Sequence, residues 1–100
     1  MSLVLTAPVE DIVLRPTQEV LTKQSLRIAW HYLDEPGTQM IHLDLSGIRF
    51  PSAEGLGTLV ALNRELRIRG GGLVLINVPT AIHEVLIITR LVEVLDIRTE

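Results

Sequence analysis

The residues best suited to chemistry in this sequence are three histidines, His31, His42 and His83. No two of them stand at the i, i+4 spacing that places two zinc ligands on one face of a helix, and no cysteine is present to complete a metal site. The chain also lacks the Gly-x-Ser-x-Gly turn that exposes the nucleophile of many hydrolases. We therefore predict no metal, no cofactor and no catalytic residue, and we expect a protein that is not an enzyme.

The stretch between residues 44 and 58 also carries hydroxyl and carboxylate side chains: Asp44, Ser46, Ser52, Glu54 and Thr58. Within this stretch Ser52 follows a short turn and precedes apolar residues at helical spacing from 56 to 66. We predict that it is a helix N-cap, whose hydroxyl accepts a hydrogen bond from a first-turn backbone N–H. Glu54 then falls in the first turn, where the helix dipole stabilises a carboxylate by about 0.3 to 1 kcal/mol. The turn itself follows a predicted strand, at the edge of an open α/β sheet where ligands and partners usually bind.

Five short apolar runs predict the strands of the sheet that carries this turn. Residues 3–6 and 12–15 are joined closely enough to form an antiparallel hairpin. The run at 40–45 predicts a buried strand, and the near-continuous run at 73–78 predicts a central strand covered on both faces. A last short strand is expected at 95–97.

Three helices are predicted between these strands. Thr22 is expected to cap the first, Ser52 the second and Thr80 the third, and the glycines at 70–72 should end the second. We predict one domain over residues 1–100 with an α/β sandwich fold. It comprises a mixed, mostly parallel sheet of about four to five strands, a short N-terminal antiparallel hairpin and three to four helices.

Composition narrows the classes of function. Hydrophobic residues make up 47% of the 100 residues, with one Trp, one Tyr and one Phe, so the core must be aliphatic. The formal net charge of -3 argues against a nucleic-acid partner, because nucleic-acid binding depends on a basic surface. The lack of cysteine fits a cytoplasmic protein, and no apolar stretch is long enough for stable membrane insertion. Apolar residues on several faces of the last helix suggest either a partner or homodimer surface, or one extra turn that packs back on the sheet.

Several motifs resemble the STAS domain, the module of anti-sigma factor antagonists. Asp-Leu-Ser-Gly-Ile at 44–48, followed by Phe50 and by Gly-Leu-Gly at 55–57, is similar to the family's Asp-Leu-Ser-Gly-Val, phenylalanine and Gly-Leu-Gly. Arg-Pro-Thr-Gln-Glu-Val at 15–20 and Gly-Gly-Gly-Leu-Val-Leu at 70–75 resemble two of its strand segments, in the right order. The resemblance spans most of the chain and implies that the sandwich is of the STAS type.

The resemblance also implies a regulatory site. In the family, the serine directly before Gly-Leu-Gly is the phosphate acceptor for a partner kinase that is also an anti-sigma factor. This position is Glu54 here, and Ala53 replaces the preceding Ser or Thr. Glu54 either imitates the phosphorylated form with a permanent negative charge or only stabilises the helix start. Ser52, the hydroxyl left in the turn, is either a displaced phosphoacceptor or only the N-cap.

The leading interpretation is a non-enzymatic protein-interaction module that binds a kinase-type anti-sigma factor through the strand-turn-helix surface at 46–59. The alternative is a cytoplasmic STAS regulatory subunit of an anion or lipid transporter, since domains of the family also accompany such carriers. A nucleotide-binding role is less favoured, because the turn is acidic where a phosphate needs hydrogen-bond donors. The residues expected to contact the partner are Ser46, Phe50, Ser52, Ala53, Glu54, Gly55 and Thr58.

Overall fold

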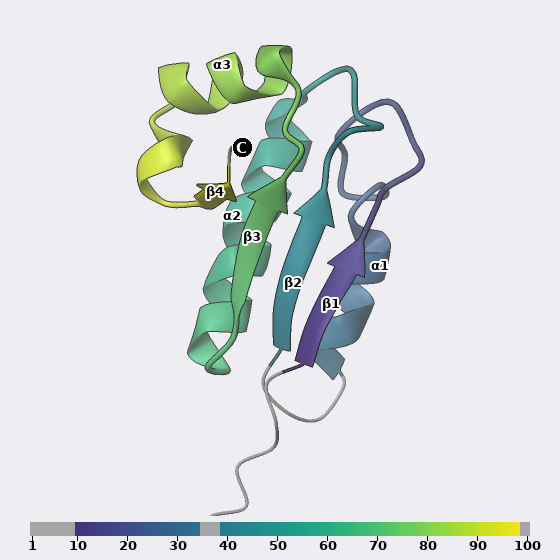
Figure 1. Ribbon diagram of the computed structural model, residues 1–100, viewed down its shortest axis with the longest axis vertical. Coiled ribbons are helices and arrows are strands. Elements are labelled where there is room, and N and C mark those ends of the chain that lie inside the picture. Colours follow the sequence, from purple (N-terminus) through teal and green to yellow (C-terminus); the bar gives the residue numbers. More distant parts are fainter. Residues whose placement is uncertain (1–9, 35–38, 99–100) are drawn as a thin grey trace, which may run out of the picture.

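The computed structural model describes residues 10–34 and 39–98, which form a four-stranded sheet with helices packed against it (Figure 1). The strands are β1 (Glu10–Leu14), β2 (Gln39–Asp44), β3 (Gly72–Ile76) and β4 (Asp96–Arg98). The helices are α1 (Arg27–His31), α2 (Ala53–Ile68) and α3 (Thr80–Ile88), with short 3-10 helices η1 (Tyr32–Asp34) and η2 (Leu91–Glu93). The strand order is β1-β2-β3-β4, and every neighbouring pair is parallel. Parallel neighbours need long crossover connections, and these contain the helices.

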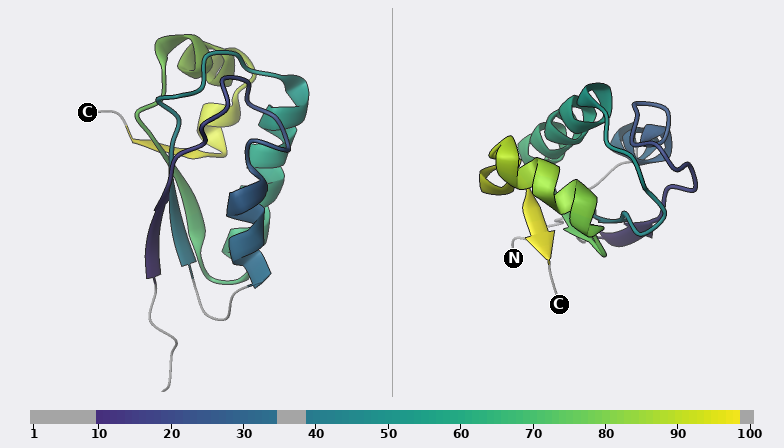
Figure 2. Two further views of the ribbon diagram at one scale, coloured as in Figure 1. Left: turned by 90° about the vertical axis from the view of Figure 1, so that its right-hand side faces the viewer. Right: turned by 90° about the horizontal axis from the view of Figure 1, so that it is seen from above.

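The hydrophobic core lies between the sheet and helices α1 and α2, which cover the same face of the sheet (Figure 2). Alternate residues of the central strands point to this face, and the register pairs Ile41 with Leu73 and Leu43 with Leu75. All four are almost completely buried, and each contributes about 1.5 to 3 kcal/mol by leaving water. The helices meet them with aliphatic side chains: Leu26, Ala29, Leu33, Leu59, Leu62 and Leu66.

Helix α3 crosses the carboxyl-terminal end of β3 and leads through η2 into β4 (Figure 1). Ile82 and Leu86 on its inner face are fully buried and belong to the core. Ile87 and Ile88 follow on the outer face and are 52% and 80% exposed. The apolar excess predicted for the last helix is therefore real, and part of it faces solvent.

The segments on either side of the central turn agree with the sequence prediction. The strand expected at 40–45 is β2, and the short strand expected at 95–97 is β4. Ser52 is the N-cap of α2, in an extended conformation with its side chain accepting a hydrogen bond from the Gly55 backbone. Gly70 follows the helix with a positive φ of 85°, the left-handed conformation that ends many helices.

The segment expected at 12–15 forms β1, which pairs in parallel with β2. The other strand of the predicted hairpin, at 3–6, lies outside the described residues, and the described part contains four strands and not five. A short run of apolar residues carries no information about strand direction, which here follows from the crossover through α1.

The strand expected at 73–78 is β3, and its residues Leu73, Val74 and Leu75 are buried on whichever face of the sheet they point to, as predicted. In residues 10–34 and 39–98, α1 and α2 pack on one face only (Figure 2). The opposite face carries the row Val13, His42 and Val74, in which Val13 is 65% exposed. Val74 is nevertheless fully buried, so a continuous apolar run indicated burial correctly without indicating what provides it.

Thr22 and Thr80 were predicted to cap helices, and neither does. Thr22 exchanges hydrogen bonds with Ser25, whose N–H donates to the Thr22 hydroxyl over 3.1 Å, and this pair closes a turn before α1. Helix α1 itself begins at Arg27 without a side-chain cap. The N-cap of α3 is Pro79, and Thr80 is already the first helical residue, so its hydroxyl does not cap the helix.

Candidate functional site: the strand-turn-helix surface

The turn after β2 is held by Asp44. One carboxylate oxygen accepts a hydrogen bond from the Ser46 backbone N–H over 2.9 Å, and the other accepts one from the Asn77 amide over 3.2 Å. Partial burial works to raise the pKa of Asp44, but the hydrogen bonds from Ser46 and Asn77 and the nearby charge of Arg15 lower the pKa below 3.8. The ionised carboxylate therefore ties the ends of β2 and β3 together at the base of the site.

Two apolar side chains are exposed where the turn approaches α2. Phe50 is 55% exposed, and Val20, which forms an isolated parallel bridge with it, is 41% exposed. Backbone hydrogen bonds fix this pairing, from Leu21 N–H to the Phe50 carbonyl over 2.8 Å and from Phe50 N–H to the Glu19 carbonyl over 3.0 Å. A rigid backbone thus presents the chain's single phenylalanine to solvent.

Both hydrogen-bonding functions of the Ser52 hydroxyl are used inside the fold. It accepts from the Gly55 N–H over 3.0 Å and donates to the Leu21 carbonyl over 2.5 Å. The first bond caps α2, and the second attaches the helix start to the segment that runs beside it. The side chain is only half-exposed, because it lies in the joint between these two parts of the chain.

The two glycines of the Gly-Leu-Gly motif have different surroundings. A Cβ on Gly55 would stand 2.1 Å from the Leu21 carbonyl oxygen, so no side chain fits there. A Cβ on Gly57 would have nothing within 4 Å. The close approach of the helix start to neighbouring backbone therefore requires glycine at position 55 and not at position 57.

Glu54 is exposed at the first turn of α2, and its carboxylate is already engaged. One oxygen accepts a hydrogen bond from the Lys23 backbone N–H over 3.1 Å. Lys23 belongs to the turn that Thr22 and Ser25 close, so Glu54 links the beginning of α2 to the segment that leads into α1. The negative charge thus has a fixed position beside the exposed apolar pair, Val20 and Phe50.

The structure places most of the predicted contact residues on one continuous surface. Ser46, Phe50, Ala53 and Glu54 are exposed, whereas Ser52 and Thr58 are half-buried. The Thr58 hydroxyl donates to the Glu54 carbonyl over 2.8 Å. Gly55 is buried against Leu21, and it shapes the surface from beneath without being able to contact a partner.

Sequence reasoning missed the contribution of residues 19–23 to this surface. Val20 extends the apolar area. The Leu21 carbonyl accepts a hydrogen bond from Ser52, and the Lys23 N–H donates one to Glu54. The motif match at 15–20 was the available signal. It identified a strand-like segment but not its position beside Phe50.

The histidines lie on three separate elements, α1, β2 and α3. Across the described residues, no group of three or more His, Cys, Asp or Glu side chains is arranged to hold a metal ion. Among the helices of that same part of the chain, none combines the length and the apolar character that crossing a bilayer requires.

Comparison with known proteins places this site in a family. A family model described as "Mlab, STAS domain" matches residues 16–96, and the chain therefore belongs to the STAS domain family. No curated protein matches the chain by sequence.

Two solved structures share the fold. A candidate anti-sigma factor antagonist from Thermotoga maritima superposes with a TM-score of 0.71 at 20% identity, covering 93% of this chain and 84% of that one. An anti-sigma-factor antagonist (STAS) domain protein from Planctomyces limnophilus gives 0.68 at 21% identity, covering 92% and 84%. The chain is thus a STAS domain with the architecture of proteins that bear the antagonist name.

Proposed function

We propose that this STAS domain is a non-enzymatic interaction module that binds a kinase-type anti-sigma factor through the strand-turn-helix surface at 46–59. The observation that carries the proposal is the exposure of Phe50 and Val20 on a hydrogen-bonded backbone, next to the fixed carboxylate of Glu54. Interface cores are enriched in exposed aromatic anchors surrounded by polar groups. A preorganised anchor also loses little conformational freedom on binding.

Glu54 acts in this proposal as a permanent substitute for the phosphorylated serine of related antagonists. Its single negative charge lies in the first turn of α2, where a phosphate would bring a charge of about -1.5 to -2. Because phosphorylation releases the partner in the family's switch, a fixed charge here should weaken binding. The domain would then respond little to the partner's kinase activity.

Ser52 is a structural cap and not a displaced phosphoacceptor in this account. Its hydroxyl proton is donated to the Leu21 carbonyl, and its oxygen accepts from Gly55. Attaching a phosphate would remove the donated bond and bring an anion against a carbonyl oxygen. Mass spectrometry after incubation with the cognate kinase should find the Ser52 peptide unmodified, and phosphate on that peptide would contradict this role.

Calorimetric titration against kinase-type anti-sigma factors tests the leading function. We expect Phe50→Ser to weaken binding at least tenfold and Glu54→Gln to strengthen it about fivefold, which corresponds to about 1 kcal/mol for a charge in a docking surface. Gln retains an oxygen that can accept from Lys23, so this variant removes the charge without removing the hydrogen bond. Glu84→Gln, on the exposed side of α3, is the matched control and should leave the affinity unchanged.

Absence of binding by the wild type, Glu54→Gln and Glu54→Ser to every such factor would remove the proposal. An unchanged dissociation constant in Glu54→Gln would leave Glu54 with only its role at the helix start.

A second candidate function is a regulatory subunit of an anion or lipid transporter. The observation that favours it is the matched family model, whose description names Mlab and not an antagonist. The exposed pair Ile87 and Ile88 on α3 would provide a docking face for a transporter subunit, or for a second copy of this chain. Co-purification with a permease that is lost in Ile88→Asp would support this function. Sedimentation of a partnerless monomer would count against both the transporter and the homodimer.

A further inference from the structure

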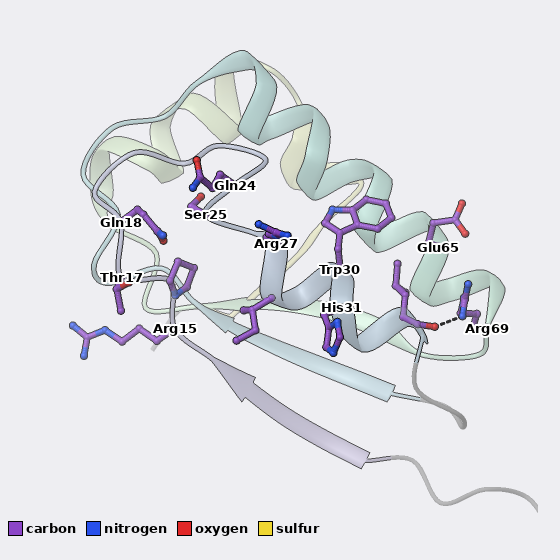
Figure 3. Close-up of a pocket in the computed structure, with 13 residues that line it drawn as sticks. Arg15, Thr17, Gln18, Gln24, Ser25, Arg27, Trp30, His31, Glu65 and Arg69 are labelled. Atoms are coloured by element: carbon purple, nitrogen blue, oxygen red, sulfur yellow. Dashed lines mark hydrogen bonds between the residues drawn. The ribbon is translucent and has the colours of Figure 1, made fainter.

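A hollow in the described part of the protein lies along α1 (Figure 3). It has a volume of about 840 Å³, within the range of pockets that enclose small organic ligands. Its walls come from the loop at 15–18, from the chain between Gln24 and Leu33, and from Glu65 and Arg69 on α2. None of the residues at 46–59 lines it, so the two sites are separate. We call it the α1 cavity.

Cationic and hydrogen-bond-donating side chains dominate the polar part of the α1 cavity. Arg27 and His31 extend from α1, and among the described residues the Arg27 guanidinium has no ion-pair or hydrogen-bond partner. Arg69 is already engaged, since its guanidinium donates to the Leu33 carbonyl. Glu65 is the one acidic residue among the described lining residues, although the chain as a whole carries a net charge of -3. The cavity is therefore locally positive on an acidic protein.

Apolar surface lies beside these donors. Ile28 is 55% exposed, and Trp30 projects between α1 and α2 near Glu65 (Figure 3). The indole Nε1 of Trp30 is shielded from solvent and has no hydrogen-bond acceptor among residues 10–34 and 39–98. An unpaired buried donor is costly, and a ligand oxygen could satisfy it once the indole turns toward the cavity. The short helix α1 thus leaves apolar side chains and an unsatisfied buried donor at the edge of the hollow.

We propose that the α1 cavity binds a small organic anion, namely a carboxylate or phosphate carried by a flat apolar group. A guanidinium presents paired N–H donors that match the oxygens of either anion, which assigns the charged end to Arg27. The apolar end packs on Ile28 and the indole of Trp30. Cationic ligands are excluded by Arg27 and Arg69, and a purely apolar ligand would leave the donors unpaired.

Trp30 provides a direct readout because it is the only tryptophan in the chain. The first probe is 1-anilinonaphthalene-8-sulfonate, an aromatic anion that accepts excitation energy from tryptophan. Its uncharged analogue, N-phenyl-1-naphthylamine, is the matched control ligand. We expect saturable one-to-one binding of the anion to the folded wild type, and weaker binding as the salt concentration rises.

Substitution of the cation separates charge recognition from dye adsorption. Arg27→Gln should weaken binding of the anion about fivefold to tenfold, the range expected for losing one charge-assisted hydrogen bond, and should change binding of the neutral analogue less than twofold. Arg64→Gln removes an equal charge from an exposed position of α2 outside the cavity and should have no effect. Circular dichroism and thermal melts of each variant establish that it is folded.

The indole resonance locates the bound probe. In the ¹H-¹⁵N spectrum the chain has one tryptophan side-chain signal, which should shift on titration with 2-naphthoate and with 1-naphthyl phosphate. A larger shift at equal saturation, with a lower dissociation constant, identifies which of the two anions is preferred. Three results would each overturn the proposal. They are an indole signal that does not shift, equal losses of anion affinity in Arg27→Gln and Arg64→Gln, and binding of 1-anilinonaphthalene-8-sulfonate that does not weaken with salt. An acidic peptide that binds this cavity when neither naphthyl anion does would overturn it as well.

Discussion

Replacing Gly55 and Gly57 separately by alanine tests how the helix start is positioned. A Cβ at residue 55 would stand 2.1 Å from the Leu21 carbonyl oxygen and 2.5 Å from its carbonyl carbon, where unbonded carbon atoms normally stay about 3.5 to 4.0 Å apart. The obstacle is backbone, so α2 or the segment at 19–23 must shift. Overpacking of this kind costs about 1 to 3 kcal/mol, partly offset by about 0.5 to 1 kcal/mol of improved helix propensity.

At Gly57 only the propensity gain applies, because a Cβ there would meet nothing within 4 Å. Gly57→Ala should therefore stabilise the domain by about 0.5 to 1 kcal/mol, while Gly55→Ala destabilises it by about 1 to 2 kcal/mol. Since 1 kcal/mol shifts the melting temperature of a domain this size by about 4 to 8 °C, the two variants should melt about 6 to 24 °C apart. Urea titration and thermal melts measure this. A Gly55→Ala domain as stable as wild type, or a Gly57→Ala domain less stable, would refute the reasoning.

Three further predictions concern the same segment. Ser52→Ala should lower the free energy of unfolding by about 1 to 2 kcal/mol in urea, because both the α2 cap and the bond to the Leu21 carbonyl are lost; a change near zero would contradict the cap. Glu54→Ala should lower the free energy of unfolding by about 0.5 to 1 kcal/mol and Glu54→Gln by less, because only Gln retains an acceptor for the Lys23 N–H. Equal losses in the two variants would show that this hydrogen bond contributes nothing to stability. The lowered pKa of Asp44 means that its stabilising effect is present above its unfolded-state pKa and is lost as the pH falls through the folded-state value. Unfolding free energies measured from about pH 5 down to about pH 3 should therefore fall more steeply for wild type than for Asp44→Asn, and parallel curves would contradict this role.

Local patterns predicted the parts of the fold that depend on neighbouring residues. The N-cap at Ser52 and the left-handed glycine at 70 follow from residue type and position alone, and both are observed. The prediction for Thr80 failed because its position relative to the helix is shifted by one residue. Pro79 lies at the N-cap instead, and a threonine at the first helical position cannot direct its hydroxyl to the same N–H groups.

The interactions that define the site depend on contacts between distant segments. Glu54 and Ser52 each bond to a residue 31 positions earlier, and nothing in the spacing of the sequence indicates that residues 21–23 lie there. The two glycines of Gly-Leu-Gly look equivalent in sequence, yet only Gly55 has a backbone carbonyl against it. The α1 cavity was not predicted either, because its walls come from three separate parts of the chain.

The measurement that tests the central claim most directly is amide chemical-shift mapping of the ¹⁵N-labelled domain during titration with a kinase-type anti-sigma factor. The proposed function requires the largest perturbations at residues 46–59 and at the adjoining segment 20–23, and it requires Phe50→Ser to reduce them at equal partner concentration. Perturbations centred on Ile87 and Ile88 of α3, with the Phe50 region unchanged, would contradict the claim.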